Sequence, residues 1–172
     1  MRNNNIVAFD NKYLGLAQKF DCGNSALNSF LGHPNALCSS IGKTWVYLSA
    51  DEDSIIGYYN ISTGSLDQVI DGRREKIGGA IHINYLAVDK RYQDKVNDSE
   101  ILFADILFAD VLSVCEEIRS IYAGFSFITL EATSDGQKLY SRFDFEKLDD
   151  DLTFSSDSDE SFSGCKMYFV LE

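Results

Sequence analysis

A polar segment between an apolar run and a long apolar helix is the part of this chain best suited to bind an anion. The apolar run, residues 84–88, suits a buried strand, and residues 89–98 after it are nearly all polar. From Glu100 onward apolar residues dominate for about five turns at the α-helical rise, and Asp98 or Ser99 can cap this helix with a side-chain oxygen. Because a helix N-terminus presents unpaired N–H groups and the positive end of the helix dipole, the sequence predicts an anion site here.

Side chains that could transfer a proton are few. His82 and Asn84 fall on one face of the strand by its period of two, and because a histidine side chain can accept a proton near neutral pH, His82 is a candidate general base. Glu131, near the end of a later strand, is a second candidate. A single histidine in a strand more often has a structural role, and this alternative stays open. His33, beside the only proline, fits a loop.

Hydrophobic periodicity and turn residues predict the elements that position these groups. Helices are expected over residues 14–20 and 36–41, and from 100 for about five turns. Two more are expected to end at residues 31 and 142, the first capped by Asn24 or Ser25 and the second by Ser134 or Asp135. Strands are expected over residues 6–9, 44–50, 55–65, 81–88 and 125–133, from 145, and over 167–171. Residues 51–54 make a hairpin turn, residues 67–79 a polar loop, and residues 149–164 an acidic, serine-rich, solvated loop.

Length, composition and charge restrict the class of protein. With 172 residues, 45% of them hydrophobic, the chain fits one folded domain over residues 1–172. No apolar run reaches the roughly 18 residues of a membrane-spanning helix, and residues 1–5 lack the apolar core of a signal peptide, so a cytoplasmic protein is expected. The net charge of −12 opposes binding to nucleic acid at long range. The four cysteines are widely spaced, so reduced thiols and no metal site are expected.

The predicted central helix contains a short repeat, in which Ile-Leu-Phe-Ala-Asp at residues 101–105 recurs at 106–110. Solenoid repeats are longer, about 20 to 50 residues, so both copies are interpreted as buried helix. Asp105 and Asp110 are expected to tilt away from the apolar bulk.

The predicted anion site resembles the central motif of the GNAT superfamily of N-acetyltransferases. The run LAVDKRYQ at residues 86–93, followed after a loop by LFADIL at 102–107, carries this resemblance. Other pieces are similar to the toxin-like branch of that superfamily: FDCG at residues 20–23, IGYYNIS at 56–62, LY at 139–140 with FDF at 143–145, and MYFVL at 167–171. The order and spacing of these pieces extend the resemblance over nearly the whole chain.

The resemblance implies a mixed, mostly antiparallel α/β sheet with helices on both faces, and acetyl-CoA as the co-substrate. In that family an amine attacks the thioester carbonyl, which backbone N–H groups of the central strand polarise. Tyr140 is then the general acid that protonates the leaving thiolate, with packing of its ring on the sheet as the alternative. The resemblance implies two groups of cofactor-binding residues: Leu86, Ala87 and Val88 beside the pantetheine arm, and Gln93, Lys95, Val96, Asn97, Asp98 and Ser99 around the pyrophosphate.

The family's loop glycines are missing from this sequence. With the motif begun at Gln93, the glycine positions fall on Val96 and Asp98, and Asp144 replaces a third glycine. A β-branched residue resists the left-handed conformation that glycine allows, and a carboxylate repels a pyrophosphate. Asn97 tolerates the left-handed conformation, so we expect it to replace a glycine there.

Two hypotheses about function follow. The first is an acetyl-CoA-dependent N-acetyltransferase that acts on a primary amine. The second is a binding or regulatory protein that keeps the GNAT fold but no longer binds acetyl-CoA. The acidic surface favours a small amine or a peptide amine as acceptor over nucleic acid. Aminoacyl-tRNA is an acceptor implied by the resemblance alone, and a homodimer and an antitoxin-like partner are left open.

Overall fold

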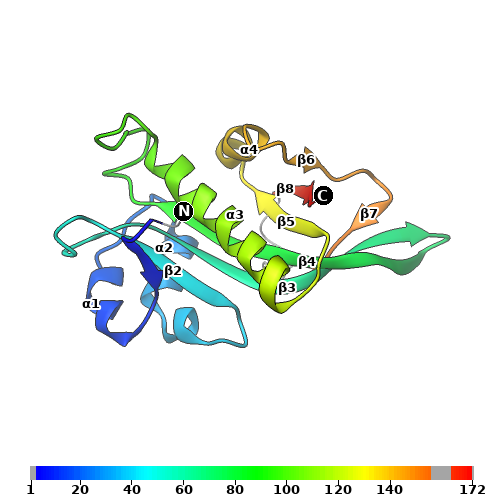
Figure 1. Cartoon of the computed structure of the whole chain (residues 1–172), viewed down its shortest axis with the longest axis horizontal. Coiled ribbons are helices and arrows are strands. Elements are labelled where there is room, and N and C mark those ends of the chain that lie inside the picture. Colours follow the sequence, from blue (N-terminus) through cyan, green and yellow to red (C-terminus); the bar gives the residue numbers. More distant parts are fainter. Residues whose placement is uncertain (1–2, 156–163, 172) are drawn as a thin grey trace. The chain divides into compact units, whose positions relative to one another are not determined.

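The computed structural model of the chain describes residues 3–155 and 164–171 (Figure 1). Their strands join into an eight-stranded, mostly antiparallel sheet in the order β1-β2-β3-β4-β5-β8-β6, and β7 pairs with β3. The chain divides into two compact units, the first made of Met1–Ile61 and Tyr85–Val114, the second of Ser62–Asn84 and Cys115–Glu172. Two long strands, β3 (Ile55–Ile70) and β4 (Arg73–Val88), run through both units. The predicted mixed α/β fold is confirmed, and a single domain over residues 1–172 stays a prediction.

The first unit is an antiparallel sheet with helices packed on it. Its other strands are β1 (Ile6–Ala8) and β2 (Lys43–Leu48), and β2 forms the predicted hairpin with β3. Its helices are η1 (Asn11–Tyr13), α1 (Leu14–Ala17), α2 (Ser25–Gly32), η2 (Pro34–Leu37) and most of α3 (Phe103–Glu117). Of the two predicted caps of α2, Asn24 and Ser25, it is the Asn24 side chain that accepts bonds from the N–H groups of Ala26 and Leu27.

Two neighbouring tyrosines of β3 show that helices cover both faces of this sheet. The Tyr58 hydroxyl donates to the Leu27 carbonyl of α2 at 2.8 Å, and the Phe30 ring stacks on Tyr58. The Tyr59 hydroxyl donates to Asp110 Oδ2 of α3 at 2.7 Å. Because successive residues of a strand point to opposite faces, α2 and α3 lie on opposite faces of the sheet.

Two predictions about α3 are corrected. The helix begins at Phe103 and not at Glu100, because residues 96–102 fold into a small hairpin closed by a β-bridge between Val96 and Leu102. Asp110 does not tilt away from the core, since it is 3% exposed and accepts the Tyr59 hydrogen bond. The first copy of the repeat therefore starts in the hairpin, and only the second copy lies wholly within the helix.

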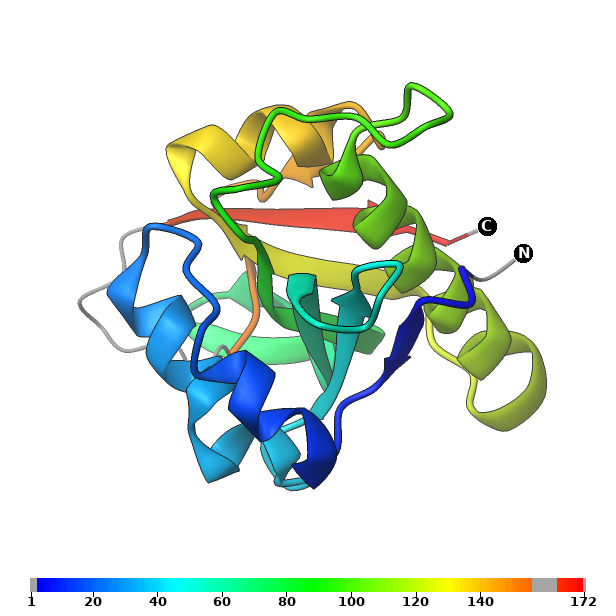
Figure 2. The ribbon, with the colours of Figure 1, turned by 90° about the vertical axis from the view of Figure 1, so that its left-hand side faces the viewer.

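The second unit contains the remaining parts of β3 and β4 and the C-terminal part of the chain. Its other elements are the π-helical turn η3 (Ile118–Tyr122), β5 (Phe127–Ala132), α4 (Ser134–Ser141), β6 (Glu146–Lys147), β7 (Leu152–Thr153) and β8 (Cys165–Val170). Strand β5 runs parallel to β4 and antiparallel to β8, which lies beside it in Figure 2. Thr133 caps α4, one residue before the predicted Ser134 or Asp135.

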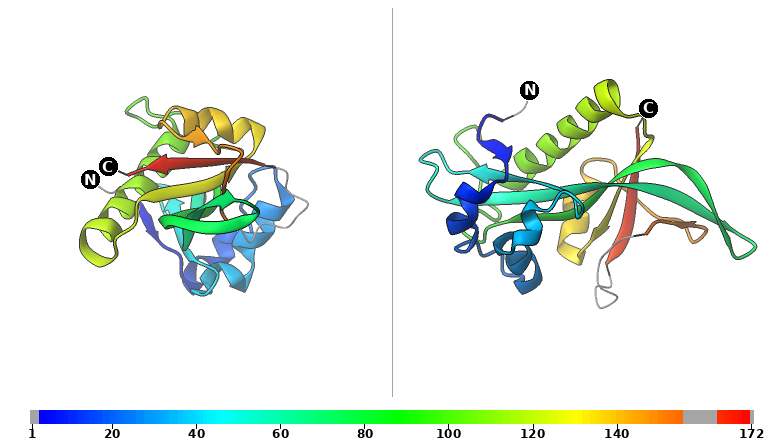
Figure 3. Two further views of the ribbon diagram at one scale, coloured as in Figure 1. Left: turned by 90° about the vertical axis from the view of Figure 1, so that its right-hand side faces the viewer. Right: turned by 90° about the horizontal axis from the view of Figure 1, so that it is seen from below.

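Residues 67–79 are a strand pair and not the loop that was predicted. Asp71 and Gly72 both have positive φ, 49° and 76°, which is the two-residue turn that Asp-Gly favours between antiparallel strands. Strands β3 and β4 therefore continue as the long two-stranded ribbon of Figure 3. Residues 73–77 are exposed, so no buried face imposes the alternating apolar pattern by which a strand is recognised.

The helix predicted over residues 36–41 is instead the 3-10 turn η2, where His33 Nδ1 accepts a bond from the Asn35 N–H at 3.1 Å. The predicted acidic loop contains β7, and its residues 156–163 lie outside the described part of the chain. Among the described helices, none has the length and apolarity to cross a membrane.

Gly57 of β3 lets α3 approach the sheet closely, which generates a first prediction. A Cβ at this position would lie 2.8 Å from the Ala87 carbonyl oxygen and 2.9 Å from Leu107 Cδ2. Gly57→Ala is therefore expected to lower the free energy of unfolding by about 1–3 kcal/mol, measured by urea denaturation. The matched control is Gly15→Ala in α1, where a Cβ meets nothing within 4 Å. Equal stability of the two variants would show that the packing around Gly57 is loose.

Candidate cofactor site

The end of β4 in the first unit has a free edge. Strand β5 pairs with β4 only over residues 80–83, and the Asp89 N–H donates to the Ile56 carbonyl of β3 at 2.8 Å. Because peptide groups of successive strand residues point to opposite edges, those of Leu86 and Val88 lie on the edge away from β3. In the described part of the chain no strand pairs with that edge beyond Ile83. The edge can therefore accept an extended ligand by strand-like hydrogen bonding.

Asp89, directly after β4, organises the turn that follows, and the sequence analysis did not single it out. Its carboxylate is buried and accepts bonds from Arg91 Nε at 2.9 Å, Arg91 Nη2 at 3.0 Å and the Asp21 N–H at 3.2 Å. Burial raises the pKa of Asp89, but the hydrogen bonds from Arg91 outweigh burial and hold this pKa below its ordinary value. The signal in the sequence was an acid at a strand end two residues before an arginine.

The turn around Asp21 is joined to this segment by a second set of bonds. The Lys90 N–H donates to the Asp21 carbonyl at 2.8 Å, and the Lys90 ammonium pairs with the Asp21 carboxylate. That ammonium, with hydrogen bonds from the Gly23 N–H and the Asn28 amide, lowers the pKa of Asp21 to about 2. The turn after α1 is therefore held against the start of the predicted pyrophosphate loop.

Gln93, the first residue of the predicted loop motif, links the end of β4 to the turn after α1. Its Nε2 donates to the Val88 carbonyl at 2.8 Å and to the Cys22 carbonyl at 2.9 Å. The Gln93 amide therefore covers one acceptor of the free β4 edge. The N–H groups of Leu86 and Val88 lie on the same edge and are the donors that a ligand would use there.

The rest of the predicted loop is the hairpin over residues 96–102. Asn97 Oδ1 accepts bonds from the N–H groups of Ser99 and Ile101, both at 3.0 Å, and the Phe103 N–H donates to the Lys95 carbonyl at 3.2 Å. Asp98 and Ser99 lie in the hairpin and do not cap α3. Asp98 is exposed, and it lies at the hairpin's turn.

The loop has left-handed residues at positions other than those predicted. Asp94 and Glu100 have φ of 56° and 60°, whereas the positive φ expected of Asn97 is not found. Val96, whose β-branched side chain resists the left-handed conformation, does not have a positive φ. Both left-handed residues of this segment, Asp94 and Glu100, carry carboxylates, and the left-handed conformation costs about 1–2 kcal/mol for each.

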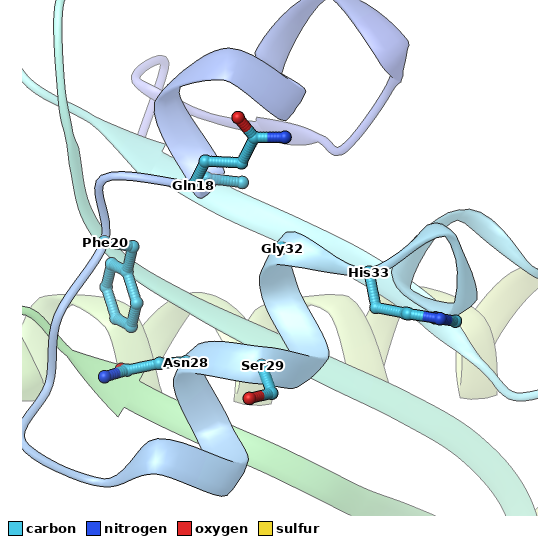
Figure 4. Close-up of a pocket in the computed structure, with 7 residues that line it drawn as sticks. Gln18, Phe20, Asn28, Ser29, Gly32 and His33 are labelled. Atoms are coloured by element: carbon cyan, nitrogen blue, oxygen red, sulfur yellow. The ribbon is translucent and has the colours of Figure 1, made fainter.

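A pocket of about 390 Å³ lies in the first unit between the end of α1 and α2 (Figure 4). Its lining includes Gln18, Phe20, Asn28, Ser29, Gly32 and His33. The Asn28 side chain is committed to Asp21 and Cys22, so this wall of the pocket is fixed by the same turn that contacts Lys90. The sequence analysis did not predict this pocket, and among the described residues no cluster of metal-ligating side chains is found there or elsewhere.

Tyr140, the predicted general acid, lies on α4 in the second unit. Its side chain is buried, with its ring 6.1 Å from that of Phe145, and burial raises the pKa of its hydroxyl well above the ordinary value. A phenol in this environment keeps its proton at neutral pH, as a general acid must. The catalytic role of Tyr140 stays a prediction.

The two candidate general bases have structural contacts in the second unit. His82 is buried, with Nδ1 2.9 Å from Thr129 Oγ1 and its ring 5.0 Å from that of Phe154. Glu131 Oε1 accepts a bond from the Gly164 N–H at 3.2 Å. These contacts favour the structural alternative that was left open for His82, and they give Glu131 a structural contact as well.

The carboxylate of Asp89 generates a second prediction. Asp89→Asn is expected to lower the free energy of unfolding at pH 7 by about 2 kcal/mol, because bonds from a cationic donor to a charged acceptor are lost. A group with a lowered folded pKa stabilises above its unfolded pKa, and this contribution is lost as the pH falls through the folded pKa. The difference between wild type and variant should therefore shrink below about pH 4 in urea titrations.

The matched control is Asp51→Asn, which alters an exposed carboxylate in the β2–β3 turn and is expected to leave stability unchanged. A difference between wild type and Asp89→Asn that does not shrink as the pH falls below about 4 would contradict a charged carboxylate at Asp89 in the folded protein.

Comparisons with known proteins found solved structures that share the fold of this chain. No protein-family model and no curated protein matches the sequence. A crystal structure described as a bacterial toxin has a TM-score of 0.73 at 19% identity, over 96% of this chain and 90% of its own. AtaTR bound with AcCoA gives 0.71 at 19% identity, over 96% and 92%. AtaT complexed with acetyl-methionyl-tRNAfMet gives 0.65 at 20% identity, over 88% and 93%. At these identities the likeness shows that the chain shares the fold of these proteins.

Proposed function

We propose that this chain is an acyl-CoA-dependent N-acetyltransferase that moves an acetyl group from acetyl-CoA to a primary amine. The free edge of β4 carries the proposal, because the N–H groups of Leu86 and Val88 point to an edge where no described strand pairs. An extended pantetheine arm bears amides that suit such an edge. The shared fold supports this choice of ligand, since AtaTR has been solved with AcCoA bound.

The chemistry assigned to the chain's own groups is direct transfer. The amine nitrogen attacks the thioester carbonyl carbon, and an N–H of Leu86 or Val88 stabilises the oxyanion that forms. The carbon–sulfur bond then breaks, Tyr140 gives its proton to the thiolate, and the amine nitrogen releases one proton to water, from which the Tyr140 phenolate regains its proton. We assign no side chain to accept the amine's proton, because His82 and Glu131 are engaged in structural contacts.

The charge of the chain and the structural comparisons favour different classes of acceptor. The net charge of −12 favours a small amine or a peptide amine. Structurally similar proteins nevertheless include AtaT complexed with acetyl-methionyl-tRNAfMet and a KacTA–DNA complex. The expectation that nucleic acid is an unlikely partner is therefore not supported, and aminoacyl-tRNA belongs in the acceptor screen beside small amines.

The first test is calorimetric titration of the protein with acetyl-CoA at moderate salt. We expect micromolar binding, weakened by about three- to tenfold in Lys95→Ala, because an exposed cation beside a diphosphate contributes about 1 kcal/mol. The matched control is Lys76→Ala, an exposed lysine of the β4 ribbon, which should bind like wild type. Absence of binding at millimolar acetyl-CoA would contradict the proposal. It would favour the alternative, a GNAT-fold binding or regulatory protein that has lost acetyl-CoA.

The second test separates chemistry from binding. Once an acceptor is found, Tyr140→Phe should lower kcat by about 10²- to 10⁴-fold while the Kd for acetyl-CoA stays unchanged. The control is Tyr122→Phe, a tyrosine that is 73% exposed at the end of η3. If Tyr140→Phe retains full kcat, Tyr140 has the packing role that was its alternative.

A further inference from the structure

The side chain of Gln93 contacts the end of β4 at the candidate site. Its Nε2 lies 2.8 Å from the Val88 carbonyl oxygen and 2.9 Å from the Cys22 carbonyl oxygen. A primary amide nitrogen carries two hydrogens, so both are donated to backbone carbonyls. The resemblance implies a place for Gln93 beside the pyrophosphate, but its amide has no hydrogen left to donate to a phosphate oxygen.

The two carbonyls also fix which way the Gln93 amide points. If the amide oxygen took the place of the nitrogen, it would face two acceptors and be repelled by both. The Cys22 carbonyl belongs to a fixed turn, because the Cys22 N–H donates to Asn28 Oδ1 at 2.9 Å and Asn28 Nδ2 donates to Asp21 Oδ1 at 2.9 Å. The turn after α1 therefore holds the Gln93 amide on the Val88 carbonyl in the absence of a ligand.

The peptide group between Val88 and Asp89 is hydrogen-bonded at both of its polar atoms. Its carbonyl accepts the Gln93 bond, and its N–H donates to the Ile56 carbonyl of β3 at 2.8 Å. An added strand would bring an N–H to the Val88 carbonyl, and the Gln93 amide already supplies one. At its end next to the loop, the free edge of β4 therefore offers the Val88 N–H as a donor, beside a carbonyl that is already capped.

The pantetheine arm differs from a peptide in a way that suits this end of the edge. In a peptide one carbon separates each N–H from the next carbonyl, so each edge of an extended chain carries both donors and acceptors. Between its two amides pantetheine has one carbon more, so in the extended arm both amide carbonyls point to one edge and both N–H groups to the other. The edge of carbonyls supplies an acceptor for the Val88 N–H and brings no N–H that would lack a partner there.

We propose that Gln93 is a positioning residue for the pantetheine arm, which caps the Val88 carbonyl and thereby leaves the Val88 N–H to bind a carbonyl of the arm. This inference rests on the proposed function, since the ligand is acetyl-CoA. Without the cap, a bound arm would remove water from the Val88 carbonyl and give it no donor, which weakens binding. Gln93 then acts on the pantetheine arm of acetyl-CoA and not on its diphosphate.

The test uses acetyl-CoA and two compounds that represent its parts, S-acetylpantetheine and ADP, with each Kd measured by NMR titration. Gln93→Met keeps the length of the side chain and removes its donors. It should weaken the binding of acetyl-CoA and of S-acetylpantetheine by about tenfold each, while the affinity for ADP stays that of wild type. The matched control is Gln18→Met, an exposed glutamine after α1, which should bind all three compounds like wild type.

The Val88 amide proton gives a readout that a merely structural role of Gln93 would not change. In ¹⁵N-labelled wild type its resonance should move downfield when S-acetylpantetheine is added, because the N–H gains a carbonyl acceptor. In Gln93→Met the movement should be smaller at equal occupancy. Gln93→Glu keeps the side-chain shape without an N–H to donate, and it serves as the second variant if Gln93→Met perturbs folding. Neutral S-acetylpantetheine is the probe for it, because the added carboxylate does not repel a neutral ligand.

The outcomes separate the role of Gln93 from the proposed function. Weaker binding of acetyl-CoA and S-acetylpantetheine with unchanged binding of ADP supports the inference. A loss for ADP alone, or an equal loss for ADP and S-acetylpantetheine, overturns it, because Gln93 then acts on the diphosphate or on the fold as a whole. Unchanged binding of acetyl-CoA by the variants, or a Val88 resonance that does not move in wild type, overturns it while acetyl-CoA binding stands. Failure of wild type and both variants to bind millimolar acetyl-CoA overturns the inference and the proposed function together.

Discussion

The buried carboxylate of Asp89 is the interaction on which the candidate site depends. A buried charge is tolerated only when donors surround it, and Asp89 has two from the Arg91 side chain and one from the Asp21 backbone. These bonds end β4, start the turn and hold the segment after α1 in place. The positions of the β4 edge, of Gln93 and of the loop depend on these bonds to Asp89.

The candidate site is made mainly of backbone groups. The donors assigned to the ligand are the N–H groups of Leu86 and Val88, whose direction is set by strand geometry and not by their side chains. Such a site persists while side chains change, provided that the strand and its end are kept. The fold itself is shared with AtaTR, with a TM-score of 0.71 at 19% identity.

The segment after Gln93 has a geometry of its own. Glycines let a backbone turn sharply, and a β-branched residue such as Val96 resists the left-handed conformation that they allow. In this chain residues 96–102 form a hairpin, the left-handed residues are Asp94 and Glu100, and Asn97 Oδ1 accepts bonds from the N–H groups of Ser99 and Ile101. Close packing elsewhere is retained, since Gly57 still lets α3 approach β3.

The sequence by itself determined the elements whose pattern is local. The buried strand ending at Val88, a cap of α2 at Asn24 or Ser25, and the β2–β3 hairpin were predicted because periodicity and capping chemistry act over a few residues. Only the tertiary structure decided which groups meet across the chain. Asp110 is buried because Tyr59 reaches it from another element, and Gln93 donates to the carbonyls of Val88 and Cys22.

Two elements were not predicted correctly. The ribbon at residues 67–79 was missed because its exposed strands carry no alternating pattern, and the start of α3 was misplaced because it depends on a bridge between Val96 and Leu102 that has no local signal in the sequence. Hydrogen bonds between distant segments leave no periodic trace in a sequence, so the arrangement of the site could be recognised only in the folded chain.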